Sequence, residues 1–196
     1  MSGIVPRWEW RTFGESFGGA EDKIRGHGAG KVRTSTETYI VSVASSTNTK
    51  VRDGLLDIKK LKQVDDNALE QWYPVMKAGF PLSPIVILDV FRAWNAPMPR
   101  VAREGYDFDQ LVRELVEPNP SLRAVQVIKE RHGYTINDCI VEVADLKFDG
   151  VPIRTVGVEM EDPARVTETV AMLSLERFEN VNYVRALKRF KGISDA

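Results

Sequence analysis

Charged residues recur two positions apart in several segments that are otherwise rich in β-branched and aromatic residues. The charged sets are Arg7/Glu9/Arg11, Lys50/Arg52, Asp57/Lys59, Lys129/Arg131, Glu142 and Glu159/Glu161. In a β-strand, residues two apart project from the same face. A solvated sheet face explains any one of these segments, but the same spacing of charges in six strands favours a shared charged surface.

A charged surface of this composition has a specific chemical meaning if the sheet closes into a barrel, because one face of each strand then lines the lumen. Clustered Lys and Arg side chains match a polyanion such as a triphosphate, and Arg offers forked donors to phosphate oxygens. Carboxylates are the ligands that Mg²⁺ or Mn²⁺ prefers, and such an ion neutralises phosphate charge and orients an attacking water. The residue types therefore predict a site for a triphosphate and a divalent cation.

The composition is that of a globular protein with balanced charge. The chain has 196 residues, 43% of them hydrophobic, with 27 Lys and Arg against 28 Asp and Glu and a formal net charge of -1. This balance excludes a broadly basic nucleic-acid coat protein, so no nucleic-acid partner is expected. Cys139 is the one cysteine and can form neither an internal disulfide nor a thiolate metal site, which favours a reducing compartment. No apolar stretch is long enough to span a membrane and no secretory signal is recognisable, so a cytoplasmic location without a membrane partner is expected.

Strand-like patterns cover most of the sequence. We expect strands at residues 4–13, 37–43, 49–52, 55–61, 84–94, 122–134, 139–147 and 153–160. Asp53-Gly54 and Asp149-Gly150 lie between neighbouring strands and are typical of tight hairpin turns. Consecutive strands joined in this way predict antiparallel pairing.

Helical patterns are fewer and lie in the middle and at the end of the chain. We expect helices at residues 65–78, 108–116, 163–175 and 182–190, and a loop with at most a short helix at 14–31. In the first helix Asp65 or Asp66 can serve as the N-cap, although Pro74 would kink or split it. The order predicts an α+β fold: an antiparallel β-barrel with helices inserted mid-chain and at the C-terminus, in a single domain of residues 1–196.

Three other groups of potentially functional residues give weaker hypotheses. Residues 26–31 suggest a phosphate-binding loop, but Arg25 and Val32 occupy positions where that motif needs Gly and Ser or Thr. Cys139 lies in an apolar strand and is expected to be buried packing rather than a nucleophile. His27 and His132 are expected to be surface or structural residues, with His132 closer to the charged strands.

Several of the charged segments follow the motif order of a known family. Arg7-Trp8-Glu9-Trp10-Arg11 stands where that family has Glu-x-Glu-x-Lys, and Lys129 to Tyr134 matches its Lys-x-Arg-x-x-Tyr pattern. The other matching segments are Thr36 to Ile40, Lys50-Val51-Arg52, Leu56 to Lys59, Val141 to Asp145, Val158 to Glu161 and Tyr183 to Leu187. In this order they resemble the CYTH-like triphosphate tunnel metalloenzymes, which include inorganic triphosphatases, thiamine triphosphatases and class IV adenylate cyclases. The likeness covers most of the chain, with two departures: Arg7 replaces the first Glu of the hallmark, and the predicted strand at 84–94 is an additional or displaced element.

The resemblance implies a triphosphate-tunnel barrel formed by one CYTH-like domain, together with a set of site residues. The implied substrate-binding residues are Arg11, Lys50, Arg52, Lys59, Lys129 and Arg131. The implied ligands of Mg²⁺ or Mn²⁺ are Glu9, Glu159 and Glu161, with Glu142 or Asp145 as a helper. Of these residues, Glu9, Lys59 and Arg131 are expected to take part in catalysis.

Three functions are consistent with this site. The first is metal-dependent hydrolysis of a triphosphate, whether inorganic, nucleoside or thiamine triphosphate. The second is a class IV adenylate cyclase reaction, in which the ribose 3′-OH of ATP attacks the α-phosphate. The third is a non-catalytic module that binds a polyphosphate or nucleotide, which the extra positive charge of Arg7 favours. The expected partner is a triphosphate-containing small molecule or polyphosphate, and a homodimer is left open.

Overall fold

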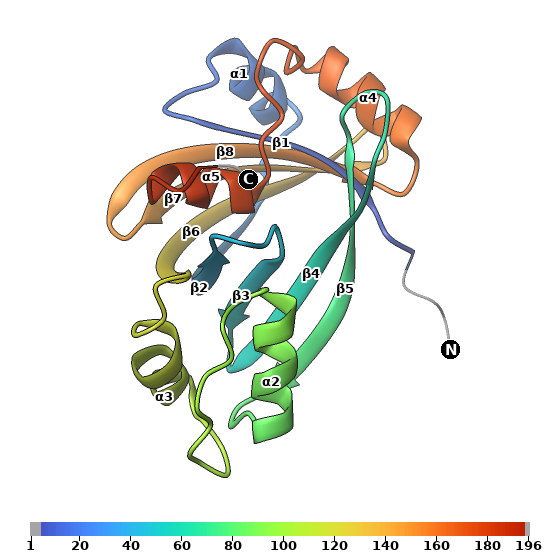
Figure 1. The fold of residues 1–196 in the computed structure, drawn as a ribbon. Coiled ribbons are helices and arrows are strands. Elements are labelled where there is room, and N and C mark those ends of the chain that lie inside the picture. Colours follow the sequence, from blue (N-terminus) through green and yellow to red (C-terminus); the bar gives the residue numbers. More distant parts are fainter. Residues whose placement is uncertain (1–4, 195–196) are drawn as a thin grey trace. The chain divides into compact units, whose positions relative to one another are not determined.

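The computed structural model describes residues 5–194, and its eight strands form a closed antiparallel barrel (Figure 1). The strands are β1 (Trp8–Gly14), β2 (Lys31–Ser42), β3 (Asn48–Arg52), β4 (Leu55–Val64), β5 (Glu70–Gly79), β6 (Leu122–Ile136), β7 (Cys139–Phe148) and β8 (Val151–Met160). They are hydrogen-bonded in the order β1-β5-β4-β3-β2-β6-β7-β8. The helices are α1 (Gly19–Arg25), α2 (Pro84–Ala93), α3 (Phe108–Gln110), which continues into the π-helix Leu111–Val116, α4 (Pro163–Met172) and α5 (Tyr183–Phe190). The predicted α+β class and barrel are confirmed.

The described chain divides into two compact units, each with its own hydrophobic core. Unit 1 comprises residues 5–35, 61–73 and 128–182, and unit 2 comprises residues 36–60, 74–127 and 183–194. The predicted strand at 4–13 appears as β1 in unit 1, while its first residue, Ile4, lies outside the described residues. None of the helices in the described range is long and apolar enough to cross a membrane.

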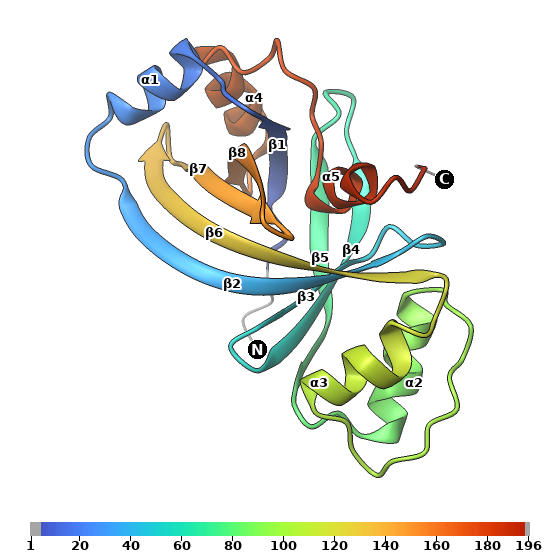
Figure 2. The same ribbon diagram turned by 90° about the vertical axis from the view of Figure 1, so that its left-hand side faces the viewer.

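Unit 1 buries one face of β1, β7 and β8 under two helices. Figure 2 shows α1 and α4 beside these strands. Trp10, Val141 and Val158 belong to a core that also includes Ile24 of α1 and Val166 of α4. Side chains alternate between the two faces of a strand, so burial of this set leaves the residues between them on the opposite face. That opposite face carries the charges of β1, β7 and β8.

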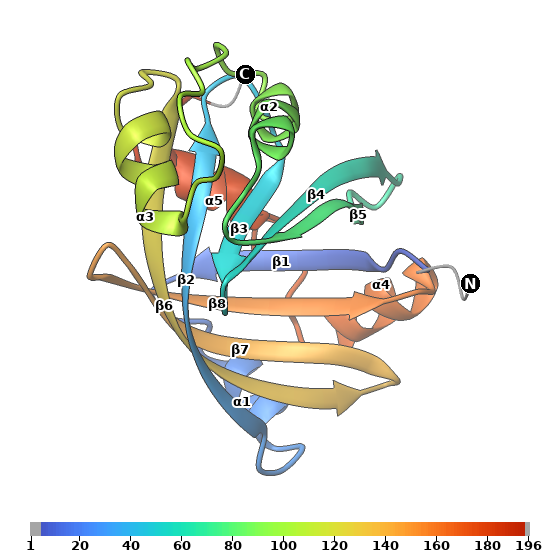
Figure 3. The ribbon, with the colours of Figure 1, turned by 90° about the horizontal axis from the view of Figure 1, so that it is seen from below.

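Unit 2 is built around β3, β4 and the helices α2 and α3 (Figure 3). Asp53 and Gly54 both have positive φ, 52° and 71°, as a two-residue hairpin turn between β3 and β4 requires, so this predicted turn is confirmed. The indole N–H of buried Trp94 donates to Thr49 Oγ1 at 2.9 Å, which fixes the residue after α2 to β3.

The predicted helix at 65–78 is wrong. The segment forms a turn and then β5, because the Asp65 carboxylate accepts from the backbone N–H groups of Asn67 at 3.0 Å and Leu69 at 2.8 Å. An Asp side chain that bonds the backbone just ahead of it can cap a helix or close a turn, and the sequence does not separate the two. Ala68, with φ of 59°, completes the turn, and Pro74 is compatible with the strand that follows.

The predicted strand at 84–94 is also wrong, because the segment is helix α2. Pro84 occupies the first turn of the helix, where a missing N–H costs nothing. Ile87, Val90 and Phe91 are buried, while Ile85 is exposed, which is the spacing of one helical face. A short apolar run has no periodicity of its own, and here only the surrounding core decides which of its residues are buried.

The remaining elements follow the prediction with shifted boundaries. The helices expected at 108–116, 163–175 and 182–190 are present, and so is the short helix within the loop at 14–31. β2 begins at Lys31 rather than at residue 37, which adds Lys31 and Arg33 to a strand.

Candidate functional site

Glu142 of β7 lies at the centre of a cluster of charged side chains in unit 1. Its Oε1 accepts from Arg11 Nη1 at 3.0 Å and from Lys129 Nζ at 2.8 Å, and its Oε2 lies 2.8 Å from Arg131 Nε. Arg11 Nε also donates to Glu9 Oε1 at 2.6 Å. We call Glu142, Arg11, Lys129, Arg131 and Glu9 the Glu142 cluster. Cations from two strands that lie far apart in the sequence, Arg11 of β1 and Lys129 and Arg131 of β6, therefore meet on one carboxylate.

The electrostatics of Glu142 are dominated by these cations. The side chain is only 6% exposed, and burial by itself raises the pKa of a carboxyl group. The positive charges of Arg11, Lys129 and Arg131 outweigh burial and lower the pKa of Glu142 from 4.5 to about 2. Glu142 is therefore ionised at neutral pH, and it holds the three cations in place.

Arg11 owes its position to the pairing of β1 with β8. Arg11 and Gly157 are Cα partners across these strands, and a Cβ built on Gly157 would lie 2.6 Å from Arg11 Nη2. The guanidinium group thus lies over the bare backbone of Gly157. Arg11 Nη1 also lies 3.3 Å from Thr155 Oγ1, which in turn donates to the carbonyl oxygen of Thr12 at 2.7 Å.

A pocket of about 370 Å³ lies beside the Glu142 cluster in unit 1. Its lining includes Lys31, Arg33, Arg131 and Tyr134, and we call it the Lys31 pocket. The Arg131 side chain is 36% exposed, so it belongs both to the buried cluster and to the pocket wall. Lys31 and Arg33 were missed as site residues, because the strand that carries them was expected to begin at residue 37. Their spacing of two residues is the same signal that identified the other strands.

Unit 2 holds a second group of charged residues, centred on buried Glu37. Arg52 Nη1 donates to Glu37 Oε1 at 3.0 Å, and the hydroxyl of Tyr39 donates to Glu37 Oε2 at 3.0 Å. The Tyr39 ring stacks on Tyr183 of α5, with ring centroids 5.3 Å apart. The C-terminal helix thus helps to hold Tyr39 against this carboxylate.

The predicted cations Lys50 and Lys59 lie on the paired strands β3 and β4 of unit 2. Lys50 pairs with Tyr39 across β2 and β3 and with Asp57 across β3 and β4, while Lys59 pairs with Asn48. Burial lowers the pKa of the Lys50 amine below 10.5, and the charges of Arg52 and Lys59 lower it further, although Glu37 opposes them. The predicted substrate-binding residues thus form two sets, Arg11, Lys129 and Arg131 in unit 1 and Lys50, Arg52 and Lys59 in unit 2.

The carboxylates predicted to bind metal are paired with cations instead. Glu9 contacts Arg11, Glu142 contacts three cations, and Glu159 Oε1 lies 3.5 Å from Arg7 Nη1. Glu161 follows the end of β8 and is exposed. Within residues 5–194, no group of three or more His, Cys, Asp or Glu side chains is arranged to hold a metal ion. The donor set in this arrangement does not fit Mg²⁺ or Mn²⁺.

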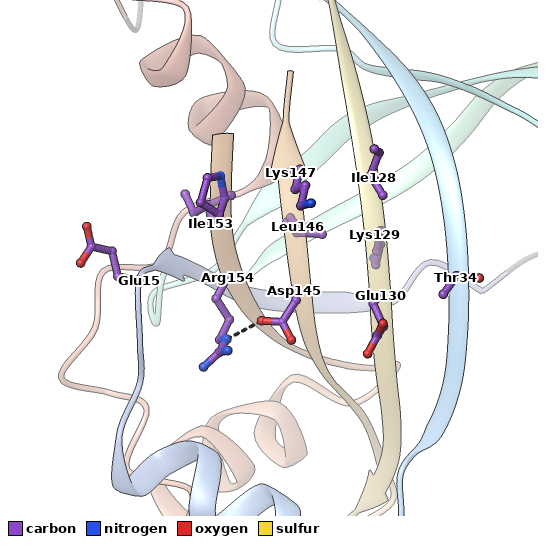
Figure 4. A pocket seen from close by; sticks show the side chains of 11 residues that line it. Glu15, Thr34, Ile128, Lys129, Glu130, Asp145, Leu146, Lys147, Ile153 and Arg154 are labelled. Carbon is purple, nitrogen blue, oxygen red and sulfur yellow. Dashed lines mark hydrogen bonds and ion pairs between the residues drawn. The ribbon is translucent and has the colours of Figure 1, made fainter. Parts of the chain in front are cut away.

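A larger pocket, of about 540 Å³, is lined by residues of β6, β7 and β8 that include Lys129 of the Glu142 cluster together with Lys147 and Arg154 (Figure 4). Asp145 and Arg154 line it. Each lies three residues along its strand from Glu142 or Gly157, and an odd spacing in a strand places Asp145 and Arg154 together on the face opposite to Glu142 and Gly157. Arg154 Nε donates to Asp145 Oδ1 at 2.7 Å, and Arg154 Nη1 donates to both oxygens of Glu21 at 3.0 Å. The arginine of this pocket is therefore held by two carboxylates.

Other chemically reactive residues in the sequence are structural. Cys139 is buried in the unit 1 core, as predicted, and burial raises the pKa of its thiol. His132 lies 3.3 Å from Glu130 Oε1. Neither residue is part of the Glu142 cluster as defined above.

Comparison with known proteins identifies the fold. No model of a protein family matches the sequence, and no curated protein matches it significantly. A Bacillus halodurans protein, provisionally assigned as an adenylate cyclase, is 13% identical and has a TM-score of 0.52, with 95% of this chain and 99% of that chain covered. A Hippeastrum protein, provisionally assigned as an adenylyl cyclase and described as having a dominant triphosphatase activity, is 10% identical and has a TM-score of 0.50, with 96% and 97% covered.

The chain therefore has the closed eight-stranded barrel fold of the CYTH-like adenylate cyclase and triphosphatase structures. This confirms the resemblance seen in the sequence at the level of fold. The identities of 13% and 10% establish nothing about substrate or activity.

Proposed function

We propose that the protein binds a triphosphate-containing small molecule or a polyphosphate on the cationic strand face of unit 1. The observation that carries this proposal is the Lys31 pocket: Lys31, Arg33 and Arg131 line one cavity, and Arg131 is anchored by Glu142. Two of these three residues are arginines, which present planar forks of N–H donors to phosphate oxygens.

The charge of this face favours a polyanion over a monovalent ligand. Its cations are Arg11, Lys129, Arg131, Lys31 and Arg33, and the carboxylates among them are Glu9 and Glu142. Five positive and two negative charges leave an excess of three positive charges, which attracts a polyanion such as a triphosphate. Because Glu142 already orders three of the cations, less side-chain entropy is lost when a ligand binds.

Binding of the phosphate chain tests this proposal directly. We expect isothermal titration calorimetry to detect tripolyphosphate binding that weakens as salt is added, because ion pairing is screened. Arg131→Gln should weaken binding about tenfold, the magnitude of one hydrogen bond to a charged group. Lys147→Gln removes an exposed cation from the opposite face and serves as the control. The proposal fails if tripolyphosphate does not bind, or if the two variants bind it equally well.

Hydrolysis of the bound triphosphate is a second candidate, favoured by the fold shared with the Hippeastrum protein of dominant triphosphatase activity. Phosphoryl transfer depends on positioning and charge stabilisation, so no side-chain nucleophile is needed. In this reading Lys129 and Arg131 neutralise the phosphates. The carboxylates that would hold a metal, chiefly Glu9 and Glu159, would first have to release their arginines.

A single activity panel separates hydrolase, cyclase and binding module. Phosphate release would be measured with tripolyphosphate, ATP and thiamine triphosphate, each with Mg²⁺, Mn²⁺ or a chelator, and cyclic AMP would be measured in the ATP samples. A hydrolase releases phosphate, and a cyclase converts ATP to cyclic AMP. A binding module does neither but still binds tripolyphosphate in the calorimeter.

A further inference from the structure

Two arginines occupy the carboxylates that a metal ion would need. Glu9 and Glu159 are Cα partners across β1 and β8, so their side chains project side by side from the same face. Glu9 Oε1 accepts from Arg11 Nε at 2.6 Å, and Glu159 Oε1 lies 3.5 Å from Arg7 Nη1. The two carboxylates thus form a pair, and each member of the pair contacts a guanidinium group.

The local charge repels a divalent cation. Arg7, Arg11, Lys129 and Arg131 contribute four positive charges, against three negative charges from Glu9, Glu142 and Glu159. Glu142 is not available as a third ligand, because both of its oxygens already contact cations. Mg²⁺ demands near-octahedral oxygen ligation at about 2.0–2.1 Å, and two carboxylates that each contact an arginine do not provide it.

Arg7 can contact an anion from its present position. Its side chain is 47% exposed, and one of its N–H groups faces Glu159 at the long distance of 3.5 Å. A guanidinium group has five N–H donors in a fixed fork, so Arg7 can bind a phosphate oxygen while it stays near Glu159. A positive charge at this position does part of what a bound metal would do for a phosphate chain.

We infer that the unit 1 site binds polyphosphate without a divalent cation, and that Arg7 and Arg11 occupy the Glu9/Glu159 pair in place of a metal ion. This inference rests on the proposed function, since it concerns how the same site binds its ligand. It predicts that chelator leaves binding intact and that Arg7 contributes to it.

Calorimetric titration of the full chain with tripolyphosphate, in excess chelator and in excess Mg²⁺, distinguishes the inference from the proposed function. We expect binding in chelator at least as tight as in Mg²⁺, which would itself compete for the phosphate oxygens. Binding only in Mg²⁺ would overturn the inference and leave the proposed function standing. Absence of binding in both conditions would overturn both.

A substitution at Arg7, with one at Lys147 as its control, tests the role of Arg7 in binding. Arg7→Gln should weaken tripolyphosphate binding in chelator about tenfold, by loss of one charge-assisted hydrogen bond, whereas Lys147→Gln should not. An unchanged affinity in Arg7→Gln would overturn the role of Arg7.

Direct metal binding is tested with Mn²⁺ by electron paramagnetic resonance. Arg7→Glu places a third carboxylate beside Glu9 and Glu159 and removes a repelling charge, so Mn²⁺ binding should rise at least about tenfold. Lys147→Glu makes the same change of charge on the opposite face and should bind no more Mn²⁺ than the parent. Tight Mn²⁺ binding by the parent protein would overturn the inference, even if Arg7→Glu failed to fold.

Discussion

Replacement of Glu142 by Gln should destabilise the protein by about 3 kcal/mol at neutral pH. The folded structure lowers the pKa of Glu142 from 4.5 to about 2, a shift of about 2.5 units, and each unit corresponds to about 1.36 kcal/mol. Gln keeps the size of the side chain but removes the charge that Arg11, Lys129 and Arg131 surround. The three cations would then repel one another without a compensating negative charge, and this lowers the free energy of unfolding.

The pH dependence of stability provides the decisive assay. Because the pKa of Glu142 is lower in the folded state, its ionised form stabilises the fold above about pH 4.5, and this contribution is lost as the pH falls towards about 2. Urea unfolding followed by tryptophan fluorescence at pH 7 and near pH 3 would measure it in the parent and in Glu142→Gln. We expect the variant to start about 3 kcal/mol lower, a decrease in Tm of about 6–12 °C for a chain of this size, and to lose less stability on acidification.

Two results would refute this reasoning. If Glu142→Gln were as stable as the parent at pH 7, the three cations would not depend on Glu142. If the variant and the parent lost the same stability on acidification, the acid sensitivity would come from other carboxyl groups.

Three further outcomes follow from the packing. Gly157→Ala should weaken tripolyphosphate binding and lower stability, because the new Cβ would meet Arg11 at 2.6 Å, whereas Gly19→Ala, with no atom within 4 Å, is the control for calorimetry and denaturation. Phe91→Ala should destabilise the unit 2 core by about 3–5 kcal/mol in urea unfolding, and a loss below about 1 kcal/mol would contradict the burial of α2. Cys139 should react with a thiol reagent in denaturant but hardly at all in the folded protein, since it is buried and burial raises its pKa; fast labelling of folded protein would contradict this.

The position of Arg7 illustrates how a sequence resemblance and a site can diverge. The motif order correctly predicted the barrel, and Arg7 is a departure from that motif. The consequence for the neighbouring carboxylates became clear only when β1 and β8 were paired, because that pairing places Glu159 within 3.5 Å of Arg7. The assignment of Glu9, Glu159 and Glu161 as metal ligands stays a prediction, and the Mn²⁺ experiment addresses it.

Features that depend on local patterns could be predicted from the residues alone. Alternation with a period of two residues predicted β1, β7 and β8 and the separation of their charged and apolar faces, because the geometry of a strand imposes that period on any chain. The pair Asp53-Gly54 predicted its hairpin because both residues readily adopt positive φ. The helix α4 was also predicted, because the signals that begin and end a helix are local.

Features that depend on distant partners could not be predicted without the folded structure. Residues 84–94 became a helix because the unit 2 core buries Ile87, Val90 and Phe91 together, and no local pattern encodes that choice. Likewise, Arg11 and Glu142 are separated by 131 positions, and their contact at 3.0 Å depends on the register of β1, β8 and β7. Register is set by hydrogen bonding and packing along the whole sheet, so residue types and spacing could nominate the charges of this site but could not assign their partners.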